Sequence, residues 1–118
     1  MAEPDPLVVR AMQDMIAANA AARDVLTVNN EALERSIERL RAGEKITDIF
    51  LSSPSSDFRQ STQDALRQLA TARHAFRLRV IAEFMAEGRP AWEIANAWGF
   101  SRQRLDRYMQ EIKNTGSG

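Results

Sequence analysis

A run of polar side chains near the carboxyl end of the chain has residue types and spacing that suit hydrogen bonding to a nucleic acid. Ser101, Arg102, Gln103 and Arg104 are consecutive, and Arg107 follows about one helical turn later. A guanidinium group can donate two parallel hydrogen bonds to the guanine edge, and a glutamine amide can pair with adenine. A serine that caps a helix leaves backbone N–H groups at a positive helix end, where phosphate binds. Such a run could therefore contact both bases and backbone.

The residues around this run follow an apolar pattern over positions 91–108, AWEIANAWGFSRQRLDRY. A small residue, Ala95, is followed four positions later by Gly99 and six positions after that by the branched Leu105. Glycine suits a turn in which φ is positive, and a small residue lets two helices cross closely. The positions that fit one packing pattern are Ile94, Ala95, Trp98, Gly99, Phe100, Leu105 and Tyr108.

This pattern resembles the helix-turn-helix of bacterial DNA-binding regulators. The resemblance covers about a sixth of the chain, and it departs from the family at Tyr108, where a smaller branched residue is usual. It implies that a recognition helix over about 101–113 lies in the major groove of double-stranded DNA, with its first residues at the base edges. The chain after Tyr108 is too short for the β-hairpin of a winged helix, so we expect a three-helix unit without a wing.

The resemblance also implies roles for individual polar side chains. We expect Arg102 and Gln103 to contact bases, where each well-formed pair discriminates by about 1–3 kcal/mol. Arg104 and Arg107 are expected to contact mainly phosphates, and Arg89 the DNA backbone where the first helix of the motif begins. Helix-turn-helix units also serve as packing units in proteins that bind no DNA. The interpretation therefore depends on the apolar pattern and the polar run occurring together.

Other chemistry has little support in the sequence. The chain has no cysteine, which excludes a disulfide, a thiolate metal site and a cysteine nucleophile. His74 is the only histidine and has no metal-ligating partner at suitable spacing, so we expect a surface or helix-packing role. Glu31, Glu34 and Glu38 are interleaved with arginine and do not suggest a catalytic carboxylate pair. Without a glycine-rich phosphate loop or a nucleophile elbow, we expect no enzyme, no metal and no cofactor.

The hydropathy of the chain and its first residues indicate where in the cell the protein is expected. The longest unbroken apolar run is four residues, 15–18, which is far too short to span a membrane. The chain opens Met-Ala-Glu-Pro-Asp-Pro and lacks the basic and apolar regions of a secretory signal. We therefore expect a cytoplasmic protein that does not enter a membrane.

The first element is predicted as a long helix from Pro6 to Ala42, with Asp5 as its N-cap and Gly43 in the left-handed cap. Its large apolar residues recur as a heptad seam, the dimer seam: Val9, Met12, Ile16, Leu26, Leu33, Ile37 and Leu40, with Asn19, Arg23 and Asn30 at intervening positions. A coiled coil tolerates a few polar seam residues, which help to fix its register. The seam predicts a homodimer; an antiparallel hairpin of the two long helices within one chain, or two hairpins in a four-helix bundle, are alternatives.

The rest of the chain also predicts helices. One apolar helical turn is expected after a cap at Thr47, followed by a serine-rich linker at 52–56, with Ser53-Pro54 starting the next helix. A second long helix is predicted from Asp57 to Glu87, closed by Gly88, on apolar residues at steps of three, four or seven: Phe58, Ala65, Leu69, Ala72, Phe76, Val80 and Phe84. No segment alternates with period two, so the fold class expected is all-α.

The expected organisation is two long helices followed by the three-helix helix-turn-helix unit. Residues 1–57 are predicted to form the dimerisation helix and linker, 58–113 the second long helix and DNA-binding unit, and 114–118 a flexible tail. The net charge of zero hides an uneven distribution. Residues 1–57 carry 6 basic and 10 acidic side chains, net −4, and residues 58–118 carry 10 and 6, net +4. An anionic partner is therefore expected at the C-terminal half.

These observations favour a sequence-specific transcription regulator that binds double-stranded DNA as a homodimer. Two other functions stay open. In one, the chain is a helical adaptor whose acidic N-terminal helix binds another protein and whose C-terminal motif only packs. In the other, it is an architectural or recombination accessory protein that binds DNA with little sequence preference and a steep salt dependence.

Overall fold

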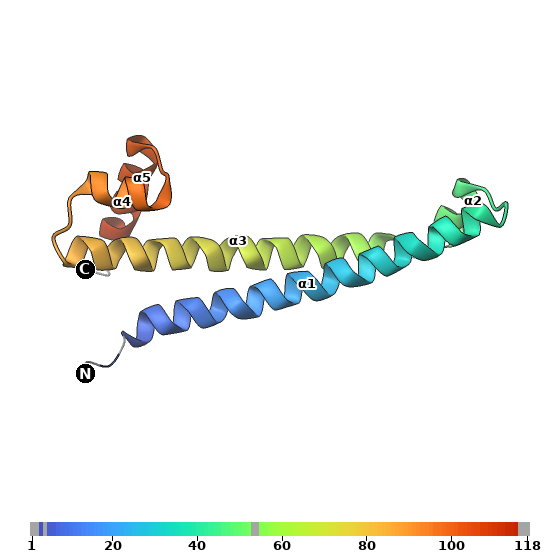
Figure 1. Ribbon diagram of the computed structural model, residues 1–118, viewed down its shortest axis with the longest axis horizontal. Helices are drawn as coiled ribbons and strands as arrows, with labels where there is room; N and C mark the ends of the chain where they lie inside the picture. The colour runs from blue at the N-terminus through green and yellow to red at the C-terminus, as the bar shows by residue number, and fades with distance from the viewer. Residues whose placement is uncertain (1–2, 4, 53–54, 116–118) are drawn as a thin grey trace. The chain divides into compact units, whose positions relative to one another are not determined.

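The computed structural model describes residues 3, 5–52 and 55–115, with only the backbone described at 55–57. These residues form five helices and no strand, so the all-α class that the sequence predicts is confirmed (Figure 1). The helices are α1 (Pro6–Arg41), α2 (Ile46–Ser52), α3 (Ser55–Ala86), α4 (Ala91–Trp98) and α5 (Arg102–Asn114).

The first helix begins and ends close to the predicted residues. The Asp5 carboxylate accepts a hydrogen bond from the Leu7 backbone N–H at 2.8 Å, which is the N-cap contact expected from the sequence. α1 ends at Arg41, and Gly43 follows with φ of 95°, a conformation that few other residues adopt without strain. The expected position of Gly43 in a left-handed cap is therefore confirmed.

Other element ends differ from the predictions. α2 begins at Ile46, so Thr47 lies inside the helix and is not its cap; the Lys45 carbonyl already accepts the Ile49 N–H at 3.1 Å. α3 begins at Ser55, within the predicted linker, while the expected start at Ser53-Pro54 lies outside the described residues. α5 includes Asn114, the first residue of the predicted tail, and residues 116–118 of that tail lie outside the described residues.

The chain divides into two compact units, and α1 and α3 each contribute to both. The hairpin unit is Asp14–Thr71 and contains most of α1, all of α2 and the first half of α3. The C-terminal unit is Met1–Gln13 with Ala72–Gly118, and it contains α4, α5 and the second half of α3. The hairpin unit is one consecutive segment of the sequence, whereas the C-terminal unit combines two separate segments.

Within the hairpin unit, α1 and α3 run side by side through small and polar residues (Figure 1). Ala22 and Ala65 are buried, and small side chains allow two helix backbones to approach closely. The Asn29 side-chain N–H donates to the Thr62 hydroxyl at 2.7 Å, and that hydroxyl donates to the Phe58 carbonyl at 2.8 Å. The hairpin therefore closes on the face of α1 that carries Ala22 and Asn29.

The dimer-seam residues lie on a different face of α1. In the hairpin unit all of them are exposed, with Ile16 at 68% and Leu33 at 62% exposure. The expected alternative in which an intrachain hairpin buries the seam is therefore wrong: a hairpin forms, but it uses the small-residue face. In the C-terminal unit Val9 is half-buried and Met12 exposed.

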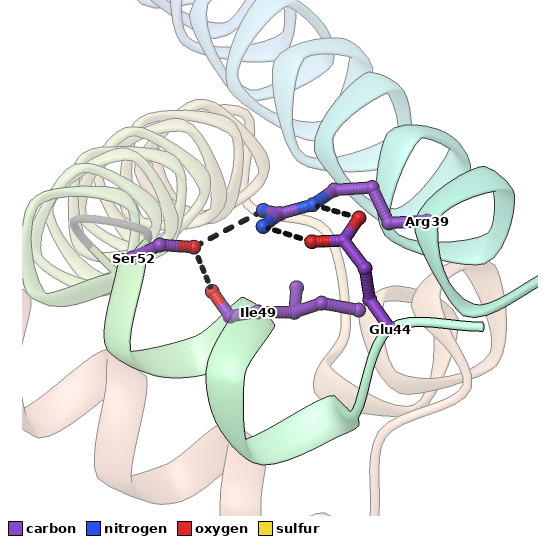
Figure 2. A network of polar contacts seen from close by, with 4 residues as sticks. All are labelled: Arg39, Glu44, Ile49 and Ser52. Carbon is purple, nitrogen blue, oxygen red and sulfur yellow. Dashed lines mark hydrogen bonds and ion pairs between the residues drawn. The ribbon is translucent and has the colours of Figure 1, made fainter. Parts of the chain in front are cut away.

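The corner between α1 and α2 is held by an arginine near the end of α1 (Figure 2). The Arg39 guanidinium donates to both carboxylate oxygens of Glu44, at 2.9 and 2.8 Å, and to the Ser52 hydroxyl at 3.1 Å. Ser52 in turn donates to the Ile49 carbonyl at 3.0 Å. The hydrogen bond from Arg39 lowers the pKa of the Glu44 carboxyl and is partly opposed by desolvation. A bidentate pair of this kind fixes both distance and orientation.

In the C-terminal unit, four branched aliphatic side chains form the core. Ile81 comes from α3, Ile94 from α4, and Leu105 and Ile112 from α5. Partly buried residues pack around them, among them Leu78, Phe84, Phe100, Tyr108 and Met109. Burial of such side chains stabilises by about 1.5–3 kcal/mol each. This core therefore determines how α4 and α5 are held on α3.

We predict that Glu44→Gln flattens the acid side of the stability profile. The folded chain binds a proton at Glu44 less readily than the unfolded chain, so this contribution is present near neutral pH and is lost as the pH falls through the lowered pKa. Urea unfolding from about pH 6 to about pH 3 should show a smaller loss of unfolding free energy in the variant. Glu34→Gln, which removes an exposed carboxylate outside this network, is the matched control and should follow the wild type. A Glu44→Gln profile parallel to the wild type would contradict the prediction.

Candidate nucleic-acid interface

The connection between α4 and α5 contains one glycine in the left-handed conformation. Gly99 has φ of 77° and ψ of 25°, and its N–H donates to the Ala95 carbonyl at 2.8 Å. The Phe100 N–H donates to the same carbonyl at 3.0 Å. These bonds satisfy the last carbonyls of α4 and turn the chain toward α5. A glycine at this position is needed because other residues pay a steric cost at positive φ.

The second helix starts at a serine cap, as the sequence predicts. The Ser101 hydroxyl oxygen accepts the Arg104 backbone N–H at 3.1 Å, while Ser101 itself is extended, with φ of −70° and ψ of 158°. The backbone N–H groups of Arg102 and Gln103, the first two residues of α5, have no partner within the helix, as at any helix start. This end of α5 therefore presents free donors beside exposed side chains.

The residues of the predicted packing pattern lie inward to different depths. Ile94 and Leu105 are fully buried, at 1% and 0% exposure. Ala95, Trp98, Phe100 and Tyr108 are half-buried, and Gly99 is exposed in the turn. The apolar positions chosen from spacing alone therefore include the two most buried side chains of α4 and α5.

An aromatic cluster joins α3, the connection and α5. The Trp98 ring stacks on Phe100 with centroids 5.6 Å apart, and it meets the edge of Phe76 at 5.9 Å. Phe100 also contacts Tyr108, with centroids 5.1 Å apart. His74 packs on Tyr108 at 5.7 Å. Trp98 is therefore a packing residue, and Tyr108 is accommodated because neighbouring rings surround it.

His74 takes the helix-packing role that the sequence left open beside a surface one. Its Nε2 lies 3.0 Å from a carboxylate oxygen of Glu111, which links α3 to α5. No three His, Cys, Asp or Glu side chains of the described residues lie together as a metal-binding group. Among these residues, no helix combines the length and apolar character that crossing a membrane requires.

The predicted DNA-contacting residues of α5 are not equally available. Arg102, Gln103 and Arg107 are exposed, whereas Leu105 and Ile112 of the same helix are buried. The Arg102 guanidinium donates to the Asp106 carboxylate at 3.0 Å. Gln103 and Arg107 make no side-chain hydrogen bond or ion pair within the described part of the chain.

Two other predicted residues have structural partners. Arg104 is half-buried, with its guanidinium carbon 4.9 Å from the Phe100 ring centre and its Nε donating to the Tyr108 hydroxyl at 3.0 Å. Arg89 donates to Glu93 at 2.9 Å and lies 3.4 Å from a Glu87 oxygen, so two carboxylates compensate its charge. The Arg104–Tyr108 and Arg89–Glu93 pairs are each four residues apart, a spacing that allows such contacts, whereas the contact of Arg104 with the Phe100 ring also depends on the turn before α5.

One residue near the site was not singled out by sequence reasoning. Arg77 on α3 is half-buried, with its guanidinium carbon 5.7 Å from the Phe100 ring centre. Its buried Nε has no hydrogen-bond partner. Arg77 and Arg104 therefore both contact one ring, which cation–π attraction favours. No sequence signal distinguishes Arg77 from the other arginines of α3, because the ring that it meets lies on another element.

No family model, curated protein or solved structure matches the chain.

We predict that Gly99→Ala destabilises the chain by about 1 kcal/mol, because alanine is strained in the left-handed region. A methyl group at Gly99 would meet no neighbouring atom within 4 Å, so the loss should come from the backbone alone. Urea unfolding measures it. Gly99→Asn should lose less unfolding free energy than Gly99→Ala, since asparagine adopts the left-handed conformation more readily than alanine. If Gly99→Ala unfolds at the wild-type urea concentration, the left-handed turn is not required.

Proposed function

We propose that the chain is a DNA-binding transcription regulator that acts as a homodimer and places α5 in the major groove. One observation carries the proposal: the apolar face of α5 is buried through Leu105 and Ile112, which leaves Arg102, Gln103 and Arg107 exposed around its first turns. A recognition helix must be held rigidly on one face and present base-reading side chains on the other. The resemblance of residues 91–108 to bacterial helix-turn-helix regulators supports the same function.

In this proposal the side chains of α5 have different tasks. Gln103 and Arg107 have no competing side-chain partner in the described chain. Arg102 is paired with Asp106 on the helix surface, and such an exposed pair contributes little, so its guanidinium can exchange the carboxylate for a guanine edge. Arg104 uses Nε on Tyr108, which leaves its two terminal nitrogens for a phosphate.

The exposed dimer seam supports a second copy as partner. Between Ile16 and Leu40 the seam extends about 36 Å along α1 at 1.5 Å per residue. Several large apolar side chains exposed along one face of a helix are typical of an interface, and a coiled coil tolerates the few polar residues between them. A single motif of this type reads only a few base pairs, and pairing two copies lets their recognition helices meet successive turns of one DNA face. A homodimer that buries the seam would therefore also place two recognition helices for binding to DNA.

DNA recognition is testable on duplexes that the protein itself selects from a randomised pool. Arg102→Ala and Gln103→Ala should weaken binding to the selected duplex by about 10-fold or more and leave binding to random duplex nearly unchanged, because base contacts carry the discrimination. Arg107→Ala should weaken both and lower the salt slope by about 1, because it removes a phosphate contact. Fluorescence anisotropy across a salt series measures these effects.

The control is Arg67→Ala, which removes an exposed arginine from the hairpin unit and should change none of these values. No binding at low salt would overturn the proposal and favour the adaptor. Equal binding to all duplexes with a steep salt slope would favour the architectural protein.

The dimer is testable by sedimentation equilibrium. Ile16→Glu and Ile37→Glu should raise the dimer dissociation constant by about 10-fold or more, because each places a charge in the apolar seam. Both side chains are exposed in the single chain, so its folding should not suffer. Leu66→Glu changes an exposed leucine of α3 outside the seam and should stay dimeric. A wild-type chain that stays monomeric at high concentration would refute the homodimer.

A further inference from the structure

The hairpin unit contains an open groove of about 710 Å³ between α1, α2 and α3. Its apolar lining comes from all three helices: Ala32 and Leu33 from α1, Ile49 and Phe50 from α2, and Phe58 from α3. The volume lies within the range of about 300–1,000 Å³ that is typical of small-molecule sites. A polar contact connects two walls of the groove, because the Asn29 side chain on α1 donates a hydrogen bond to Thr62 on α3.

The apolar lining is partly exposed to water. Phe50 is 63% exposed although it lies against the groove, and Leu33, which also lines the groove, belongs to the dimer seam. An aromatic ring that remains in water on a folded chain forgoes the stabilisation of burial, about 25 cal/mol per Å² of apolar area. An occupant with an apolar body would recover this energy.

The charged side chains of the groove are all basic among the described residues that line it. Three arginines contribute: Arg35, Arg39 and Arg59. Arg39 is committed to Glu44 and Ser52, as Figure 2 shows. Arg35 and Arg59 are exposed and make no ion pair with a described side chain. Two uncompensated guanidinium groups beside an apolar surface favour an occupant that carries a negative charge.

We propose that this groove binds a small apolar monocarboxylate, with its hydrocarbon body on Phe50, Phe58 and Ile49 and its carboxylate at Arg35 and Arg59. Charge complementarity favours an anion, because a guanidinium group beside an apolar surface can exchange water for a charge-assisted hydrogen bond to a carboxylate. The geometry of the corner supports a preformed site, since the Arg39–Glu44 pair holds α2 at the end of α1. The site lies wholly in the hairpin unit and does not depend on DNA binding.

The test is isothermal titration calorimetry on the full chain with decanoate below its micelle-forming concentration, and with decanol as a neutral probe of equal chain length. Decanoate should bind, and decanol should bind about 10-fold or more weakly. The Arg35→Ala, Arg59→Ala double variant should lose that discrimination, with decanoate falling to the level of decanol. Arg67→Ala, which removes an exposed arginine that does not line the groove, should behave as the wild type.

The apolar contact has a matched pair of neighbouring residues. Phe50→Ser should weaken decanoate by about 10-fold or more, because it removes a groove wall. Leu51→Ser should have no effect, because Leu51 is 88% exposed on the same helix and does not line the groove. Both side chains are largely in water, so neither variant should unfold the chain, and thermal unfolding of each verifies this.

Several results would overturn the proposal. They are no heat of binding with decanoate, equal affinity for decanol, or equal losses in Phe50→Ser and Leu51→Ser. A fourth is a change of oligomeric state in Phe50→Ser by sedimentation equilibrium, which would show that a second copy occupies the groove. Calorimetry measures decanoate binding in the absence of DNA, so failure of this proposal is distinguishable from failure of DNA recognition.

Discussion

Burial of Leu105 in the core formed with Ile81, Ile94 and Ile112 is the interaction on which the candidate interface depends. It fixes the rotation of α5 about its own axis, because the helix must keep this side chain out of water. Once that face is buried, Arg102, Gln103 and Arg107 are exposed together. Neither the polar side chains nor the turn at Gly99 could present this face without the core beneath them.

Burial of one helix face also shapes α1, but here the buried face carries small side chains. The hairpin closes on the small side chains near Ala22, so the larger seam residues stay in water. Large apolar side chains would otherwise compete for the inner face, but small ones allow the closer helix approach. The chain thereby folds its hairpin and still keeps an apolar stripe for another molecule, which is the arrangement that the proposed homodimer needs.

Arginine has distinct tasks in the two units. Arg39 fixes a corner through a bidentate pair, and Arg104 lies on an aromatic ring, while Arg35 and Arg59 remain beside an apolar groove without a described acidic partner. A planar guanidinium group can pair, stack and recognise an anion, whereas lysine offers only a point charge. This versatility gives physical sense to a basic set made up almost entirely of arginine.

The sequence by itself determined what depends on neighbours along the chain. Helical periodicity predicted the all-α class, and local backbone chemistry predicted the Asp5 and Ser101 caps and the left-handed glycines. The spacing around Gly99 also identified Ile94 and Leu105 as buried. These properties need only a helix of 3.6 residues per turn and the sterics of one residue.

The tertiary structure alone decided which helix faces meet. The sequence could not show that the hairpin avoids the dimer seam, that Arg104 and Arg77 converge on Phe100, or that three helices line an open groove together with Arg59. Each of these places together residues that are distant in sequence. Such contacts depend on how competing apolar faces are buried across the whole fold, and periodicity within one helix does not specify that choice.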